Sequence, residues 1–197
     1  GYLFGSDLSS DGRKTNSHCA VYIDNRNSSE FGDMGGWFQT PKKVIINGPR
    51  NVLKEISNDE GIGIFEGAHD GYVKSHGISH TRQLFLSRNG NNLRGSDQLH
   101  YSGAPGQIPV EVIIRFHLHP QVSAARVKSE QILLKVYNQK AGWLFKCRGA
   151  ETALDRSVYL EKNRRSSCQQ IVLRSPANQI QTNGNLTINW AFSRHSS

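Results

Sequence analysis

Short segments with strand-like character recur along most of this chain, and helix-like periodicity is nearly absent. Segments such as 110–120 (VEVIIRFHLHP), 130–137 (EQILLKVY) and 142–148 (GWLFKCR) are rich in β-branched and aromatic residues. Turns containing Gly and Asn separate these segments, and the spacing is roughly ten residues, as in many all-β domains. The pattern predicts an antiparallel β-sandwich with two stacked sheets and few or no helices.

The remaining expected strands have the same character and are found at 18–24, 42–47, 61–69, 78–88, 152–161, 167–175 and 185–194. The segment 51–56 (NVLKEI) is different, because it has the look of a short helical turn. No internal repeat and no linker divides the 197 residues, so we expect residues 1–197 to form a single domain.

Two histidines lie two positions apart in the segment RFHLHP (115–120). Because side chains alternate between the two faces of a strand, one set of residues should face the core: Val112, Ile114, Phe116 and Leu118. His117 and His119 then share the opposite face, with Cα atoms about 6–7 Å apart. They could share a metal or an anionic ligand, or they could simply line a polar groove or a wet strand face.

The excess of basic over acidic residues indicates which kinds of molecule this chain can bind. The formal net charge is +8 and the sequence pI is about 9.6, which favours an anionic partner such as an acidic polysaccharide. We expect no nucleic-acid partner, because the basic residues are dispersed and not interleaved with aromatic residues. We also expect no insertion into a membrane, because no apolar stretch reaches about 18 residues. The three cysteines form no CxxC pair, which argues against a cysteine zinc site.

A dense polar motif occurs at 68–72 (AHDGY), and SHTR (79–82) follows it closely. One interpretation is a polar cluster around a sugar or a metal ion. The alternative interpretation is a hairpin in which Asp70 and Gly71 form the turn.

Several runs in this chain are similar to sequences of the heparinase II/III-like family. They are NSHCAVYIDNRNSSEF (16–31), GAHDGYVKSHGISHTRQLFLSRNGNNLRGSDQL (67–99), VIIRFHLHP (112–120) and INWAF (188–192). The resemblance extends from about residue 16 to residue 192 and is poor between 32 and 60.

This resemblance implies a polysaccharide lyase in which an N-terminal α/α toroid precedes a C-terminal antiparallel β-sandwich. The present chain corresponds to the sandwich, and the toroid is absent from it. The implied reaction is β-elimination on a uronic-acid-containing polysaccharide such as a glycosaminoglycan. His18 matches a family histidine that acts with a Tyr and an Asn of the toroid, either as the base or as a donor that neutralises the substrate carboxylate. The isolated chain should therefore be inactive, and the resemblance implies a periplasmic location.

The resemblance further implies a structural zinc, with His69 as the candidate ligand and His18 as an alternative one. Many relatives have His-x-His at the first strand, whereas this chain has Asn16, Ser17 and His18. Other polar and aromatic residues are assigned to the substrate cleft: Tyr72, His80, Arg82, Arg115, His117 and His119. The alternative function is a non-catalytic module that binds an acidic glycan or that braces the toroid.

Overall fold

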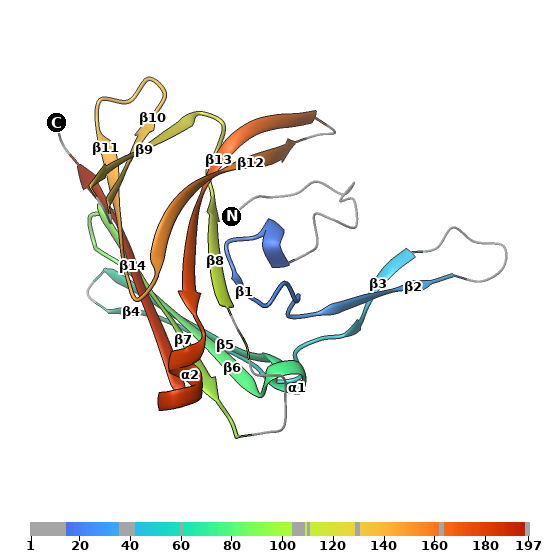
Figure 1. Cartoon of the computed structure of the whole chain (residues 1–197). Coiled ribbons are helices and arrows are strands. Elements are labelled where there is room, and N and C mark those ends of the chain that lie inside the picture. The colour runs from blue at the N-terminus through green and yellow to red at the C-terminus, as the bar shows by residue number, and fades with distance from the viewer. Residues whose placement is uncertain are drawn as a thin grey trace.

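The computed structural model describes residues 15–35, 42–59, 61–103, 109, 111–128, 131–161 and 164–195. Two stacked antiparallel sheets and a projecting two-stranded hairpin make up this part of the chain (Figure 1). Strands contribute 70% and helices 7% of the structure, which confirms the predicted β-sandwich with few helices.

The smaller sheet has four strands in the order β1 (Val21–Ile23), β8 (Glu111–His117), β13 (Arg164–Pro176) and β12 (Glu151–Glu161). In this sheet Ile114 pairs with Val21 on one side and with Leu173 on the other. All three side chains lie in the buried core, while Ile113 packs on the opposite face. The predicted alternation of residues 112–118 is therefore confirmed.

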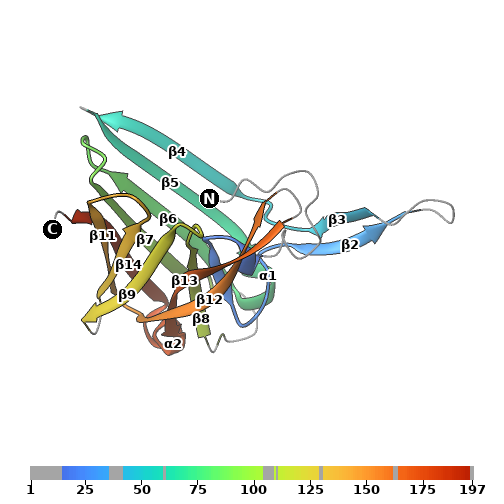
Figure 2. The ribbon, with the colours of Figure 1, turned by 90° about the horizontal axis from the view of Figure 1, so that it is seen from above.

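The larger sheet has eight strands, which Figure 2 shows from above. Their order is β4 (Val52–Asp59), β5 (Ile62–Tyr72), β6 (Ile78–Leu86), β7 (Asn92–Tyr101), β14 (Asn185–His195), β11 (Gly142–Arg148), β10 (Gln131–Val136) and β9 (Val122–Lys128). Strands β5, β6 and β7 are consecutive in the chain, and β14 adds the C-terminal segment beside β7. This topology places residues 69, 80, 97 and 190 on adjacent strands.

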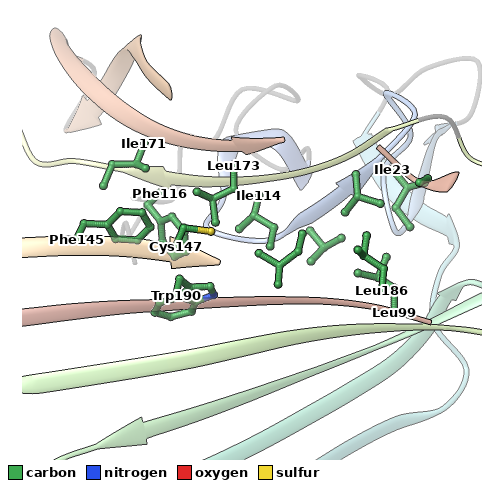
Figure 3. Close-up of a cluster of buried hydrophobic side chains, with 14 of the residues drawn as sticks. Ile23, Leu99, Ile114, Phe116, Phe145, Cys147, Ile171, Leu173, Leu186 and Trp190 are labelled. Atoms are coloured by element: carbon green, nitrogen blue, oxygen red, sulfur yellow. The ribbon is translucent and has the colours of Figure 1, made fainter. Parts of the chain in front are cut away.

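The main core fills the space between the inner faces of the two sheets (Figure 3). At its centre the ring of Trp190, from the large sheet, meets the ring of Phe116, from the small sheet, at 4.7 Å between centroids. Phe145 and Phe192 add edge and tilted contacts around this pair. Each such large side chain contributes about 1.5–3 kcal/mol when it is fully buried, so the aromatic group holds the two sheets together.

A hairpin and short helices lie outside the two sheets. Strands β2 (Glu30–Met34) and β3 (Lys42–Asn47) form the projecting hairpin (Figure 1). The helices α1 (Val73–His76) and α2 (Asn178–Asn183) lead into β6 and β14. Neither helix in the described ranges is long and apolar enough to cross a bilayer.

The structure differs from the sequence-based expectations at a few segments. The helical turn expected at 51–56 is wrong, because these residues belong to β4, which pairs with β5 from Val52 to Asp59. Pairing with a neighbouring strand overrides a weak local helical preference. Strands β2, β7 and β9 and the helices α1 and α2 were not expected, and β1 is shorter than the predicted strand 18–24.

The packing of the Trp190 ring depends on a glycine. A Cβ atom on Gly95 would lie 2.1 Å from the nearest atom of that ring. We expect Gly95→Ala to lower the free energy of unfolding by about 2 kcal/mol, as overpacked core sites do. Gly63→Ala is the matched control, because a Cβ there would be 3.6 Å from its nearest neighbour. Chemical denaturation of both variants measures the difference, and equal stabilities would contradict this account of Gly95.

Candidate functional site

His18 lies on a short loop that leads into β1, and the loop is braced at its start. The backbone N–H of His18 donates to the carbonyl of Thr15, 3.1 Å away, which is the first residue of the 3-10 turn Thr15–Ser17. Thr15 in turn donates its backbone N–H to Asn27 Oδ1 (2.9 Å), and its Oγ1 accepts the N–H of Ser28 (3.0 Å). His18 is intermediate between buried and exposed. The loop thus holds a partly accessible residue on a fixed backbone.

A second brace joins this loop to the large sheet. Arg82, on β6, donates from Nη1 to the carbonyl oxygen of Cys19. The same guanidinium donates from Nε to Asp97 Oδ1 (2.7 Å) and from Nη2 to Asp97 Oδ2 (3.0 Å). Such a bidentate pair fixes both position and orientation. Arg82 therefore connects the residue after His18 to a carboxylate on β7.

The carboxylate of Asp97 has no exposed surface. Besides the two bonds from Arg82, it accepts His80 Nε2 at Oδ1 (2.8 Å) and Trp190 Nε1 at Oδ2 (2.8 Å). Burial alone would raise the pKa of Asp97, but the hydrogen bonds from His80 and Arg82 and the positive charge of Arg82 hold that pKa below its usual value. Asp97 is consequently a buried anion, and each of its two carboxylate oxygens accepts two hydrogen bonds.

A chain of two histidines leads from Asp97 to β5. His80 Nδ1 lies 3.1 Å from His69 Nε2, and His69 Nδ1 accepts the backbone N–H of Gly71 (3.2 Å). Because Nδ1 of His69 accepts, a neutral His69 carries its proton on Nε2 and donates to His80. His80 then carries its proton on Nε2 and donates to Asp97. With both rings neutral and protonated on Nε2, the three hydrogen bonds from Gly71 through His69 and His80 to Asp97 each have one donor and one acceptor.

The neutral state of His69 agrees with its electrostatic surroundings. Burial and the neighbouring His80 lower the pKa of His69 to about 4, and the carboxylate of Asp70 only partly opposes them. At neutral pH the ring therefore acts as a hydrogen-bond relay with no charge.

The segment Asp70–Gly71 is not a hairpin turn, because β5 continues to Tyr72 and the chain reverses through α1 and the left-handed Gly77 (φ 67°). The carboxylate of Asp70 instead accepts the backbone N–H groups of Arg50 (2.8 Å) and Asn51 (3.1 Å). Gly71 allows a close approach, since a Cβ there would lie 2.6 Å from the carbonyl oxygen of Ser28. Both residues therefore fix neighbouring loops, and Ser28 belongs to the brace of the His18 loop.

The surroundings of His69 do not fit a zinc ion. Both of its ring nitrogens already have partners, in Gly71 and His80. Across the described ranges, no group of three or more His, Cys, Asp or Glu side chains is placed to hold a metal. Ligation of zinc by His69 stays a prediction for metal analysis.

Tyr72, which was assigned to the substrate cleft, lies in the core with no exposed surface. Its hydroxyl donates to the carbonyl of Val21 (2.8 Å), and burial raises the pKa of this phenol. The ring lies between those of His69 (5.9 Å between centroids) and His76 (6.3 Å). In this structure Tyr72 fixes β1 to β5 and presents no surface to a ligand.

Arg115 and His117 do not join the cluster around Asp97, because they lie on the outer face of the small sheet. Arg115 is 5.4 Å from the ring centroid of Tyr22, and its Nη1 is buried without a hydrogen-bond partner among the residues that the structure describes. Burial and the nearby Arg174 lower the pKa of Arg115. His117 Nδ1 lies 2.8 Å from Ser157 Oγ.

His119 lies beyond the end of β8, in the turn before β9, and its ring packs on that of Tyr159 at 5.0 Å between centroids. Its Nδ1 accepts the backbone N–H of Gln121 (3.2 Å). The structure therefore gives His117 and His119 different neighbours, Ser157 and Tyr159. The predicted site residues consequently divide into two groups, one between the sheets and one around the small sheet.

Sequence reasoning missed Asp97 and Trp190, which complete the cluster. A signal existed for Asp97, since it alternates with Leu93, Gly95 and Leu99 on the inward face of a strand. A carboxylate in such an inward position predicts a buried ion pair. Trp190 gives a weaker signal, because any inward tryptophan on a strand can serve the core alone.

Comparison with known proteins identifies a family model and a curated relative that are similar to this chain. The family model described as Heparinase II/III-like, C-terminal, matches residues 2–191. A curated relative, FtsZ-localized protein C of Caulobacter vibrioides, is 25% identical over 158 residues, which are 76% of this chain and 26% of the relative.

Solved structures agree in fold. A heparan sulfate lyase HepC mutant from Pedobacter heparinus matches with a TM-score of 0.63 at 14% identity, covering 94% of this chain and 25% of that one. A heparinase III gene product matches with a TM-score of 0.66 at 13% identity, with the same two coverages. The chain thus spans about a quarter of the length of these relatives.

The buried carboxylate should be essential for stability. In Asp97→Asn the new amide NH₂ would face donors from His80, Arg82 or Trp190, and the positive charge of Arg82 would lose its partner. We expect the free energy of unfolding to fall by about 3 kcal/mol, as when one member of a buried ion pair is removed. Chemical denaturation measures this loss. Asp155→Asn, an exposed acid on β12, should change stability by less than about 0.5 kcal/mol; equal losses would contradict the role of Asp97.

Stability should also fall as the pH is lowered from about 6.5 to about 4. The pKa of His69 is about 4 in the folded protein and near 6.5 when unfolded, so only the unfolded chain binds a proton at this site within that window. We expect a loss on the order of 2 kcal/mol between pH 7 and pH 4, measured by denaturation at each pH. His69→Gln should flatten the profile in this window. An unchanged slope in the variant would show that His69 is not the group responsible.

Proposed function

The chain belongs to the heparinase II/III-like family as a C-terminal domain, and we propose that it lines the catalytic cleft of a polysaccharide lyase. The proposed substrate is an acidic, uronic-acid-containing polysaccharide, and the reaction is β-elimination. The observation that carries the proposal is the partly exposed His18, which is held on a loop braced by Thr15 and by the Arg82–Asp97 pair.

The reaction has requirements that define the tasks of the residues. A base removes the proton from C5 of the uronic acid, the electrons form a C4–C5 double bond, and the C4–O bond to the leaving sugar breaks. An acid then supplies a proton to the leaving oxygen. Negative charge builds on the substrate carboxylate during proton removal, so a donor or cation beside it lowers the barrier.

His18 suits two of these tasks. A neutral imidazole accepts the C5 proton, and a protonated imidazole donates to the substrate carboxylate. Either role requires a ring held within hydrogen-bond reach of the sugar, and the fixed backbone around His18 meets this need. His80, Arg82 and Asp97 then act as positioning residues, because they hold the carbonyl of Cys19 and, through it, the loop.

The other catalytic groups would come from outside this chain. The chain spans about a quarter of its structural relatives, and the family resemblance assigns a Tyr and an Asn to an N-terminal toroid. We therefore propose that the toroid of a longer protein is the main partner of this domain, and that the 197-residue chain alone does not turn over substrate.

A second candidate function is a non-catalytic module that binds an acidic glycan or braces the toroid. It is favoured by Asn16, which occupies the place where many relatives carry the first histidine of a His-x-His motif. A lyase that has lost one such histidine retains the fold and the positive charge while losing turnover.

Lyase activity distinguishes the two candidates. In the longer protein that contains this domain, we expect His18→Ala to lower turnover of an acidic polysaccharide by at least about 100-fold, as the loss of a general base does. The unsaturated uronate product is followed by its ultraviolet absorbance. His100→Ala is the matched control, since His100 is exposed on the outer face of β7 beside Asn185, and it should leave turnover within about twofold.

The isolated chain provides the complementary test. It should yield no unsaturated product from heparin, heparan sulfate or alginate. Turnover by the isolated chain would overturn the proposed need for the toroid, and near-normal turnover by His18→Ala would remove His18 from the mechanism.

A further inference from the structure

We propose that the outer face of the large sheet, directed away from the small sheet, carries a second binding groove for an acidic polysaccharide. The groove has a volume of about 640 Å³ and lies over strands β5, β6, β7, β14, β11 and β10. It shares a ligand class with the cleft proposed above; of the cluster around Asp97 only Trp190 also lines the groove, and His18 does not. The inference is argued from the groove itself, so it does not depend on His18.

Strand pairing places a row of polar side chains across the floor of this groove. Gln83 pairs with Ser96, Ser96 with Asn189, and Asn189 with Arg148. Paired residues lie on the same face of a sheet, and the neighbours of these residues in sequence, such as Trp190, face the core. The floor is thus built from side chains that can donate and accept hydrogen bonds.

A second row of outward side chains crosses the same four strands, two residues further along each strand, and has a different composition. It runs through Phe85, Arg94, Ala191 and Lys146, again in register. The small side chain of Ala191 lies between the two long cations, which accounts for the hollow at this point. Phe85 has 37% of its surface exposed, which makes it an accessible aromatic ring at the β6 side of the groove.

Charge in the groove favours an anion. Three exposed cations line it, namely Arg94, Lys146 and Arg148, against the single carboxylate of Glu66. That carboxylate accepts a hydrogen bond from Gln83 Nε2 (2.5 Å), which takes up part of its capacity. A ligand with carboxylate or sulfate groups would therefore find complementary charge.

Other features of the lining favour a sugar polymer over a compact anion. Phe85 and Ile64, which is 39% exposed, provide an apolar wall against which the C–H face of a sugar ring can pack. Side chains of Gln83, Asn189 and Gln131 offer amides to hydroxyl groups. The groove crosses six strands, so it suits an extended chain that alternates apolar faces, hydroxyls and acidic groups.

Binding by the intact chain tests this proposal without any need for turnover. The probe is polygalacturonate, a polymer of uronic acid, measured by titration calorimetry at low salt. Neutral dextran and single-stranded DNA serve as comparison ligands. We expect polygalacturonate to bind, dextran to bind far more weakly, and the affinity to fall as salt is raised.

A matched pair of double variants locates the site. Phe85→Ala with Lys146→Ala removes one exposed aromatic and one exposed cation from the groove, and should weaken polygalacturonate binding at least tenfold. Tyr137→Ala with Lys140→Ala removes the same two side-chain types from an exposed position outside the groove, and should leave the affinity within about twofold. Thermal unfolding of each variant confirms that the fold is intact before binding is compared.

The other outcomes overturn the proposal in distinguishable ways. An unchanged affinity in the groove variant, with a loss in His18→Ala, would place glycan binding in the cleft and leave the proposed lyase function standing. Equal binding of dextran would contradict the argument from charge. Tighter binding of single-stranded DNA would make nucleic acid the occupant. Absence of polygalacturonate binding at low salt would remove the groove as a polysaccharide site, whatever the activity assays of the longer protein show.

Discussion

A carboxylate can be buried between two sheets at tolerable cost only when its lone pairs are engaged, and Asp97 meets this condition with four hydrogen bonds. The donors come from β6 and β14, which flank β7 on its two sides. Arg82 extends the network to the carbonyl of Cys19, and His80 extends it to His69 on β5. A single buried charge thus links four neighbouring strands of the large sheet, β5, β6, β7 and β14, to the loop that carries His18.

The arrangement also depends on the absence of side chains at two positions. Gly95 leaves space for the ring of Trp190, which both packs against Phe116 and donates to Asp97. Gly71 lets the backbone of Ser28 approach β5, and Ser28 belongs to the brace of the His18 loop. The close packing at these two glycines and the hydrogen bonds of Asp97 therefore both help to hold the loop before β1 in place.

The polar groups described above lie in two different regions, one between the two sheets and one on the outer face of the large sheet. The network that supports the His18 loop is centred on the buried Asp97, between the sheets, where low solvent access strengthens electrostatic interactions. The outer face of the large sheet carries exposed cations and amides over a shallow groove. One surface holds the loop of His18 in place, and the other presents charge and hydrogen-bonding groups to solvent.

Periodicity in the sequence was enough to predict the fold class and the alternation of residues 112–118, whereas His18 and His69 were singled out by the family resemblance. The first two predictions rest on local rules, since the side-chain period of a strand and the character of its turns do not depend on distant residues. Strand order was not available from such rules. The folded structure was needed to show that Asp97 and Trp190, 93 positions apart, share a hydrogen bond, and that His117 and His119 contact different neighbours. The reason is physical: periodicity fixes which face a side chain occupies, whereas partners across strands depend on which strands pair and in what register.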